Sequence, residues 1–169
     1  MDSLIYRALV ELIQGLAVLM VIAYVMTRIP SFGDLLNRRL SLTHRVLLGL
    51  VFGLISIFGT LRSVNMFGGL ANFRDLGPAI AGLLAGPVAG GIAGLIGGAH
   101  RYFLGGLTAE PCSVATVLAG LIGGLFYLRK KGRPIRIREV TAVMAGITLL
   151  HVLVITPLML GLSNEIRQI

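Results

Sequence analysis

Charged residues are scarce in this sequence, and the shortage excludes a soluble fold. Only 13% of the 169 residues are charged, whereas a soluble domain carries about 25% and needs them to cover its surface. The chain has a single cysteine, Cys112, which excludes an intrachain disulfide. No set of cysteines and histidines has the spacing of a metal site. We therefore expect a lipid-facing protein without a metal or another cofactor.

Long apolar runs occupy most of the chain. Hydrophobic residues make up 56% of it, and a helix needs about 20 apolar residues to cross a bilayer core. The first run lacks a basic start followed by a small-residue cleavage site, so it is interpreted as a retained helix rather than a signal peptide. The sequence predicts an all-α, polytopic membrane bundle, one domain over residues 1–169. Its expected hydrophobic segments are 4–27, 46–61, 77–101, 113–128 and 140–161.

Positive charge gathers between the apolar runs. The formal net charge is +8, and residues 28–45 and 129–139 form the two most basic connections. In a soluble protein this excess would suggest nucleic acid, but the basic runs lack interleaved aromatic residues and lie beside spans. There they indicate cytoplasmic loops and contact with anionic lipid. If both loops are cytoplasmic, segment 77–101 has to enter the membrane and return on the outer side.

Glycine is concentrated in and after this segment. Of the 23 glycines, 13 fall between residues 77 and 124. Gly86-Pro87 divides segment 77–101 into two pieces, each about half a bilayer long. The sequence leaves open one kinked spanning helix and a broken helix that turns back, and we favour the broken form because it places both basic loops in the cytoplasm. Five glycines recur every four residues and would let a neighbouring helix approach closely: Gly82, Gly86, Gly90, Gly94 and Gly98.

Arg74 and Arg101 are the main candidates for a binding site. Each borders the glycine-rich segment, and a cation at this depth is costly, so it indicates a functional site by default. A guanidinium matches a carboxylate in two parallel hydrogen bonds, so two of them near half-helix ends would favour a small anion. In the broken form the two arginines converge on one face. The alternatives are snorkelling to the interface and, for Arg74, a local pair with Asp75.

Other polar residues nearby have both a structural and a functional interpretation. Asn72 can hold its loop or donate to a ligand, and Ser113 can cap the fourth span or donate to a ligand. Cys112 is either a small buried hydrophobe or a ligand contact. Glu11 and Glu110 are candidate counter-ions for the arginines. No pair of groups suits acid–base catalysis, so no catalytic residue is predicted. The three histidines are interpreted as structural: His44, His100 and His151.

One stretch, residues 71–125, combines several motifs. An Asn-x-Arg precedes the glycine segment, a Gly-Pro lies in its middle and a His-Arg at its end, and a Gly-Gly and a cysteine then precede a glycine-rich span. This stretch resembles the membrane input module of LytS-type receptors, the five-transmembrane receptor region found before histidine kinases and diguanylate cyclases. A weaker likeness covers residues 37–60. Phe73 and Asp75 depart from the family pattern, and Asp75 could partly neutralise Arg74.

The resemblance implies a sensor in the bacterial inner membrane, and some members of the family are associated with pyruvate or related small carboxylates. Members usually continue through another membrane helix into a C-terminal cytoplasmic output domain, which we expect to lie outside this chain, and a homodimer is a family expectation. Thr116 is added to the expected contacts because it lies one helical turn beyond Cys112. The resemblance implies by position that Arg74, Arg101, Cys112 and Ser113 contact the ligand, and Asn72 and Thr116 complete the set of expected contacts.

Three functions are weighed. The leading hypothesis is a membrane sensory input module of a signalling receptor, in which a small carboxylate shifts the balance between two helix packings. The alternative is the substrate-binding membrane component of a vitamin-type transporter, which also relies on glycine-rich helix packing. A membrane enzyme has the least support, because the sequence offers no acid–base pair or metal site. The expected partners are the carboxylate, the lipid bilayer and the output domain, and no nucleic acid.

Overall fold

The computed structural model describes five α-helices and a short hairpin. It covers residues 40–61, 64–66, 69–71, 74–106, 108–130 and 136–158, with four single positions besides. The helices are α3 (Leu42–Leu61), α4 (Leu76–Ala85), α5 (Pro87–Leu104), α6 (Ala109–Arg129) and α7 (Ile137–Leu150). A π-helical segment, η1 (His151–Ile155), follows α7, and the antiparallel strands are β1 (Val64–Met66) and β2 (Gly69–Ala71).

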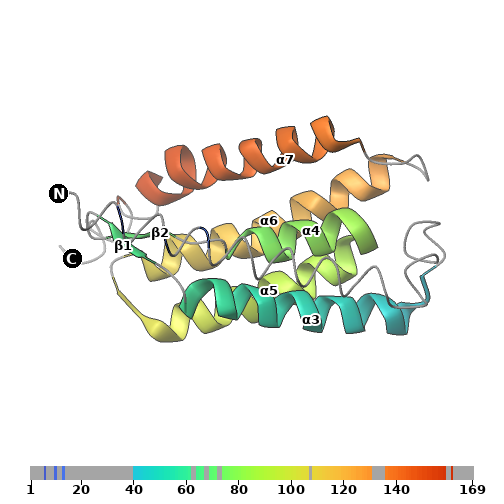
Figure 1. Ribbon diagram of the computed structural model, residues 1–169, viewed down its shortest axis with the longest axis horizontal. Coiled ribbons are helices and arrows are strands. Elements are labelled where there is room, and N and C mark those ends of the chain that lie inside the picture. The colour runs from blue at the N-terminus through green and yellow to red at the C-terminus, as the bar shows by residue number, and fades with distance from the viewer. Residues whose placement is uncertain are drawn as a thin grey trace.

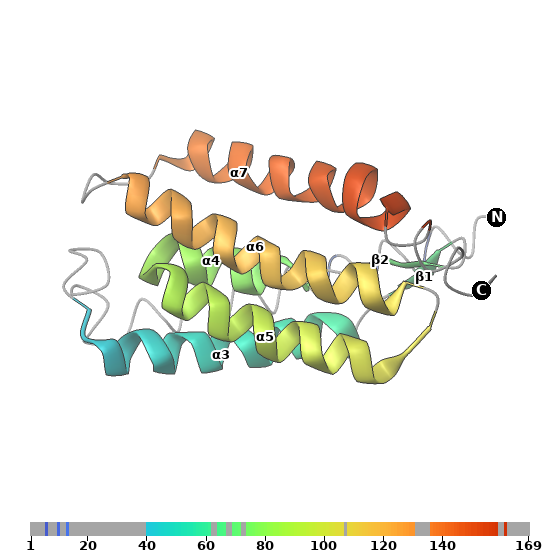
Figure 2. The ribbon, with the colours of Figure 1, turned by 180° about the vertical axis from the view of Figure 1, so that it is seen from behind.

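The helices lie roughly antiparallel in one bundle. α3 and α7 form opposite sides, and α4, α5 and α6 lie between them (Figures 1 and 2). The hairpin lies at one end of the bundle, and the end of α6 and the start of α7 lie at the other (Figure 1). Within the described residues, three helices are long and apolar enough to cross a membrane: Leu42–Leu61, Ala109–Arg129 and Arg138–Leu158.

The predicted all-α class is confirmed, and three of the predicted segments coincide with these spans. The expected segment 4–27 lies outside the described residues apart from isolated positions. The β1–β2 hairpin lies between the predicted segments 46–61 and 77–101, where no strand is predicted. Its strands have three residues each, which is too short for an alternating pattern to stand out in the sequence.

The glycine-rich segment is broken and folds back on itself. Gly86 ends α4 with φ of 89°, a left-handed conformation that a side chain rarely adopts. Pro87 then opens α5, where its missing N–H costs no helical hydrogen bond. A Cβ on Gly90 would lie 2.8 Å from the Cα of Gly82, so the two arms touch just beyond the break. The broken alternative is therefore correct, because no straight helix brings these residues together.

Small residues form the interior, and large apolar side chains face outward. The buried positions of α4, α5 and α6 are mostly alanine and glycine, which lets backbones approach closely, as is usual for helices in membranes. The exposed large hydrophobics include Leu47, Leu54, Leu95, Leu125 and Leu153. This distribution is the reverse of that in a soluble protein and suits a lipid environment.

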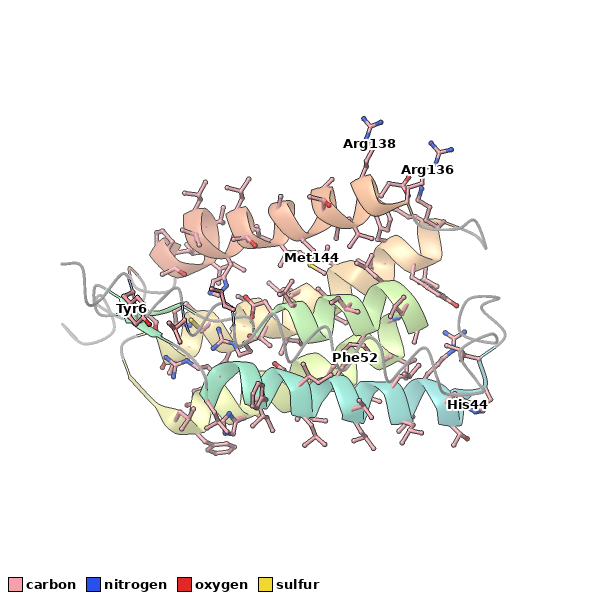
Figure 3. All side chains as sticks on the ribbon, in the orientation of Figure 1. Tyr6, His44, Phe52, Arg136, Arg138 and Met144 are labelled. Carbon is pink, nitrogen blue, oxygen red and sulfur yellow. The ribbon has the colours of Figure 1, made fainter. Side chains whose placement is uncertain are left out.

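Basic side chains mark one end of the bundle. His44 on α3 and Arg136 and Arg138 at the start of α7 lie at the same end (Figure 3). Lys130, just after α6, pairs there with Glu139 of α7. The guanidinium of Arg45 lies 5.7 Å from the centre of the Tyr127 ring. The described ends of the two basic connections therefore lie at one end of the bundle, as expected if both connections are on the same side of the membrane.

Candidate functional site

Arg74 lies deep inside the bundle at the N-terminal end of α4. Its side chain is 1% exposed. Its Nε donates to the hydroxyl of Thr116 on α6 at 2.7 Å. Its backbone carbonyl accepts a hydrogen bond from the hydroxyl of Ser56 on α3 at 3.0 Å. Since Thr116 lies seven residues into α6, the guanidinium sits about 10 Å below the start of that helix. Arg74 therefore does not snorkel to the interface.

Asp75 joins three helices around this arginine. One carboxylate oxygen lies 3.4 Å from the Nε of Arg74, which is the local pair considered from sequence. The same oxygen lies 2.7 Å from the hydroxyl of Thr116. The other oxygen lies 2.7 Å from the Nδ1 of His151 on η1. Because a carboxylate accepts hydrogen bonds, Nδ1 of His151 carries the proton in this contact.

Arg101 lies near the outer end of α5 and is 2% exposed. Its two terminal nitrogens donate to the carbonyl of Gly105 at 2.5 Å and to the hydroxyl of Thr108 at 3.1 Å. Its Nε is buried without a hydrogen-bond partner. Among the described residues, no acidic side chain forms an ion pair with Arg101. The guanidinium is thus a buried cation whose charge the described residues leave uncompensated.

The two arginines contact one stripe of α6. Arg74 bonds to Thr116 and Arg101 bonds to Thr108, with Cys112 midway between these threonines. Residues four apart lie on the same side of a helix, so Thr108 and Thr116 are separated by about 12 Å along it. The Cys112 thiol is buried and interacts with both His151 and Arg74. The structure therefore brings four of the predicted residues into one region: Arg74, Arg101, Cys112 and Thr116.

The other predicted residues do not join this region. Ser113 donates to the carbonyl of Ala109 at 2.7 Å and lines an open apolar groove between α5 and α6. Asn72 and Glu11 lie outside the described residues. Glu110 is exposed and forms no ion pair with either arginine, so Asp75 takes the place proposed for it beside Arg74. The suggestion that Glu110 is a counter-ion is therefore wrong.

His151 is a residue of the site that the sequence analysis does not predict. It was interpreted as structural because the histidines show no metal spacing, yet it lies within hydrogen-bond distance of Asp75. A signal for it was present, since His151 interrupts an apolar run inside a predicted span. An ionisable residue at that depth indicates a functional site by default. Contact with a residue 76 positions earlier in the chain is a feature that only the fold reveals.

Comparison with known proteins gives the chain a family. The family described as "5TMR of 5TMR-LYT" matches residues 29–168. The chain belongs to this family. It is 37% identical to the sensor histidine kinase BtsS of Escherichia coli K12 over 158 residues, which cover 89% of this chain and 28% of that protein. It is 32% identical to the sensor histidine kinase YpdA of the same strain over 128 residues, 74% of this chain and 23% of that protein.

A more distant relative also matches this 5TMR domain. The chain is 28% identical to the sensor protein LytS of Bacillus cereus over 137 residues, which cover 71% of this chain and 23% of that protein. No solved structure matches the chain. The chain spans about a quarter of the length of the curated relatives it matches. As a 5TMR domain it is a multi-pass membrane sensor domain of the type found in sensor histidine kinases, and it resides in the bacterial inner membrane.

In this 5TMR domain, Thr116 is expected to be structurally sensitive. Its buried hydroxyl accepts from Arg74 and lies 2.7–2.8 Å from two acceptors, Asp75 and the carbonyl of Cys112. Thr116→Val removes the hydroxyl and leaves Arg74 and Asp75 without this hydrogen-bond partner. We therefore expect a loss of about 1–3 kcal/mol in the free energy of unfolding. Thermal unfolding in detergent measures it.

The control for this variant is Thr148→Val on α7, where the hydroxyl donates to the Met144 carbonyl at an exposed position. That substitution should change stability by no more than about 0.5 kcal/mol. Equal effects of the two substitutions would contradict a special role of the buried hydroxyl.

Proposed function

We propose that this chain is the ligand-sensing input module of a signalling receptor such as a histidine kinase, and that it binds a small carboxylate such as pyruvate between Arg74 and Arg101. The observation that carries the proposal is the guanidinium of Arg101, which is buried without an acidic partner among the described residues. In this proposal the chain supplies recognition, and catalysis belongs to an output domain. The related sensor histidine kinases support the receptor role, and the charge of the site supports the ligand class.

The charges of the described region favour an anion. Arg74 and Asp75 form an ion pair, while Arg101 contributes a positive charge without an acidic partner among the described residues. An isolated ion in a low-dielectric interior is costly unless it is paired. One carboxylate between the two arginines would offset that cost and use donors that Arg101 has to offer, including its Nε. A neutral ligand would leave the excess charge in place.

The location suits a ligand that arrives from outside the cell. Arg101 bonds to Gly105 and Thr108 in the turn between α5 and α6, at the end opposite to the basic side chains (Figure 3). Arg74 lies deeper, at the start of a half-length helix. Broken helices of this kind supply binding sites in other membrane proteins because their ends present polar groups within the membrane. A small acid would thus enter beside Arg101 and extend toward Cys112 and Arg74.

Thermal unfolding of the purified chain in detergent tests the proposal. Pyruvate and a panel of small 2-oxo and 2-hydroxy acids are compared with methyl pyruvate, which keeps the shape but has no negative charge. An acid at 100 times its dissociation constant should stabilise the chain by about 2.7 kcal/mol, and methyl pyruvate should have no effect.

If no acid stabilises the chain, the carboxylate site is refuted, and a panel of vitamins then tests the transport alternative. Equal stabilisation by methyl pyruvate would show that the arginines do not recognise the negative charge of the ligand.

A further inference from the structure

Among the described helices, α7 makes few contacts with the others. Only 11% of the span Arg138–Leu158 is buried, compared with 50% of α6. At the basic end, Lys130 pairs with Glu139. In the middle, Met144 points toward α4 and α6 and packs near Ala79 and Ala119 (Figure 3). Contacts at the opposite end of this span, around η1, are therefore important for the position of α7.

One attachment at that end is the contact between His151 and Asp75. The Nδ1 of His151 lies 2.7 Å from Asp75, and both side chains are largely buried. His151 is also the first residue of η1 and shares the inward side of α7 with buried Ile147 and Ile155. A π-helical turn departs from regular α-helical geometry and often occurs at functional sites. The departure begins at His151, which reaches the site from the end of this span.

We infer that His151 is a positioning residue of the ligand site and the link through which occupancy of the site is transmitted to α7. The inference deepens the proposed function and rests on it. His151 holds one oxygen of Asp75 while Arg74 and Thr116 share the other oxygen. The orientation of Asp75 thus depends on α7, and the guanidinium of Arg74 depends on Asp75.

A bound carboxylate changes the balance of these contacts. A carboxylate at Arg74 competes with Asp75 for the guanidinium, since both are anions and the fork of an arginine has a limited number of donors. Asp75 then relies more strongly on His151, and the outer end of α7 is drawn toward α4. A ligand shifts an equilibrium only as far as it binds the two states differently. The Asp75–His151 contact supplies that difference.

Spin-label distance measurements test this link. Nitroxide labels are placed at the exposed positions Leu125 on α6 and Leu149 on α7, and labelling of the unmodified chain measures any background at Cys112. His151→Leu removes the N–H donor, whereas His151→Asn keeps a donor near the position of Nδ1. Leu153→Ala, on the exposed side of η1, is the control.

Without ligand, His151→Leu should broaden the distribution of label distances, and His151→Asn and Leu153→Ala should leave it unchanged. Pyruvate should narrow the distribution in the unsubstituted chain and in His151→Asn. It should leave the His151→Leu distribution unchanged, although thermal shift still reports pyruvate binding with a dissociation constant within about tenfold of the original. If His151→Leu does not fold, His151→Ala, which also lacks the N–H donor, takes its place.

A His151→Leu chain that matches the unsubstituted chain without ligand, or that still responds to pyruvate, overturns the inference. Failure of the proposed function can be distinguished from failure of this inference. If the proposed function is wrong, no acid shifts the unfolding temperature of the unsubstituted chain. The ligand-free comparison still decides whether His151 anchors α7.

Discussion

Gly120→Ala is expected to destabilise the bundle by about 3 kcal/mol or more, at the upper end of the cost of overpacking. A Cβ at this position would lie 2.0 Å from the carbonyl oxygen of Gly90. The obstacle is backbone on a facing helix, so no side-chain rotation relieves it, and α5 and α6 have to separate. Thermal unfolding in detergent and the yield of folded protein measure the effect.

Gly146→Ala provides the matched control. Gly146 is also a helical glycine, but a Cβ there meets no atom within 4 Å. Alanine is favoured over glycine in a helix by about 0.5–1 kcal/mol, so this variant should be as stable as the parent or more stable. If the two substitutions have similar effects, the close contact between α5 and α6 is not what makes Gly120 necessary.

Arg101→Met is expected to weaken carboxylate binding by roughly thirtyfold or more, because loss of one partner from a buried charge pair costs about 2–5 kcal/mol. The stability of the ligand-free chain should change far less. The substitution removes a buried charge whose Nε has no partner, which offsets the loss of the hydrogen bonds to Gly105 and Thr108. Isothermal titration with pyruvate and thermal unfolding without ligand measure the two effects separately.

Two comparisons sharpen this test. Arg101→Lys keeps the charge but loses the planar fork, so its affinity should lie between those of the parent and Arg101→Met. Arg138→Met removes an exposed arginine at the opposite end of the bundle and should leave pyruvate binding unchanged (Figure 3). An Arg101→Met chain that retains the parent affinity would make Arg101 a structural residue and would remove the main support for the anion site.

Local patterns in the sequence were sufficient for the membrane class and for most helices. Runs of apolar residues have to be helical in lipid, because each backbone polar group needs a partner within its own segment. The bounds of α3 and α6 agree with the predicted spans to within four residues at either end. The Gly86-Pro87 break was also visible, because the two residues have special backbone requirements wherever they occur.

The sequence favoured a folded-back segment over a kinked one but did not decide between them. The choice depends on whether Gly82 and Gly90 meet, and that contact exists because α6 presents Gly120 to both arms. The spacing of four residues along the chain is the same in either arrangement. Tertiary packing decides between the two arrangements. Small residues permit close approach of a helix but do not determine which helix packs against them.

By itself, the sequence determined that the chain is a helical membrane protein with two arginines beside a glycine-rich segment interrupted at Gly86-Pro87. Charge scarcity, apolar run length and the chemistry of glycine and proline are local properties. They can be recognised without knowing which distant residues a segment contacts. Only the tertiary structure decided that Arg74 is paired with Asp75 and Thr116, that Arg101 is buried without an acidic partner among the described residues, and that His151 reaches the site. These are contacts between distant parts of the chain, and burial and electrostatic partners are fixed only when the helices pack together.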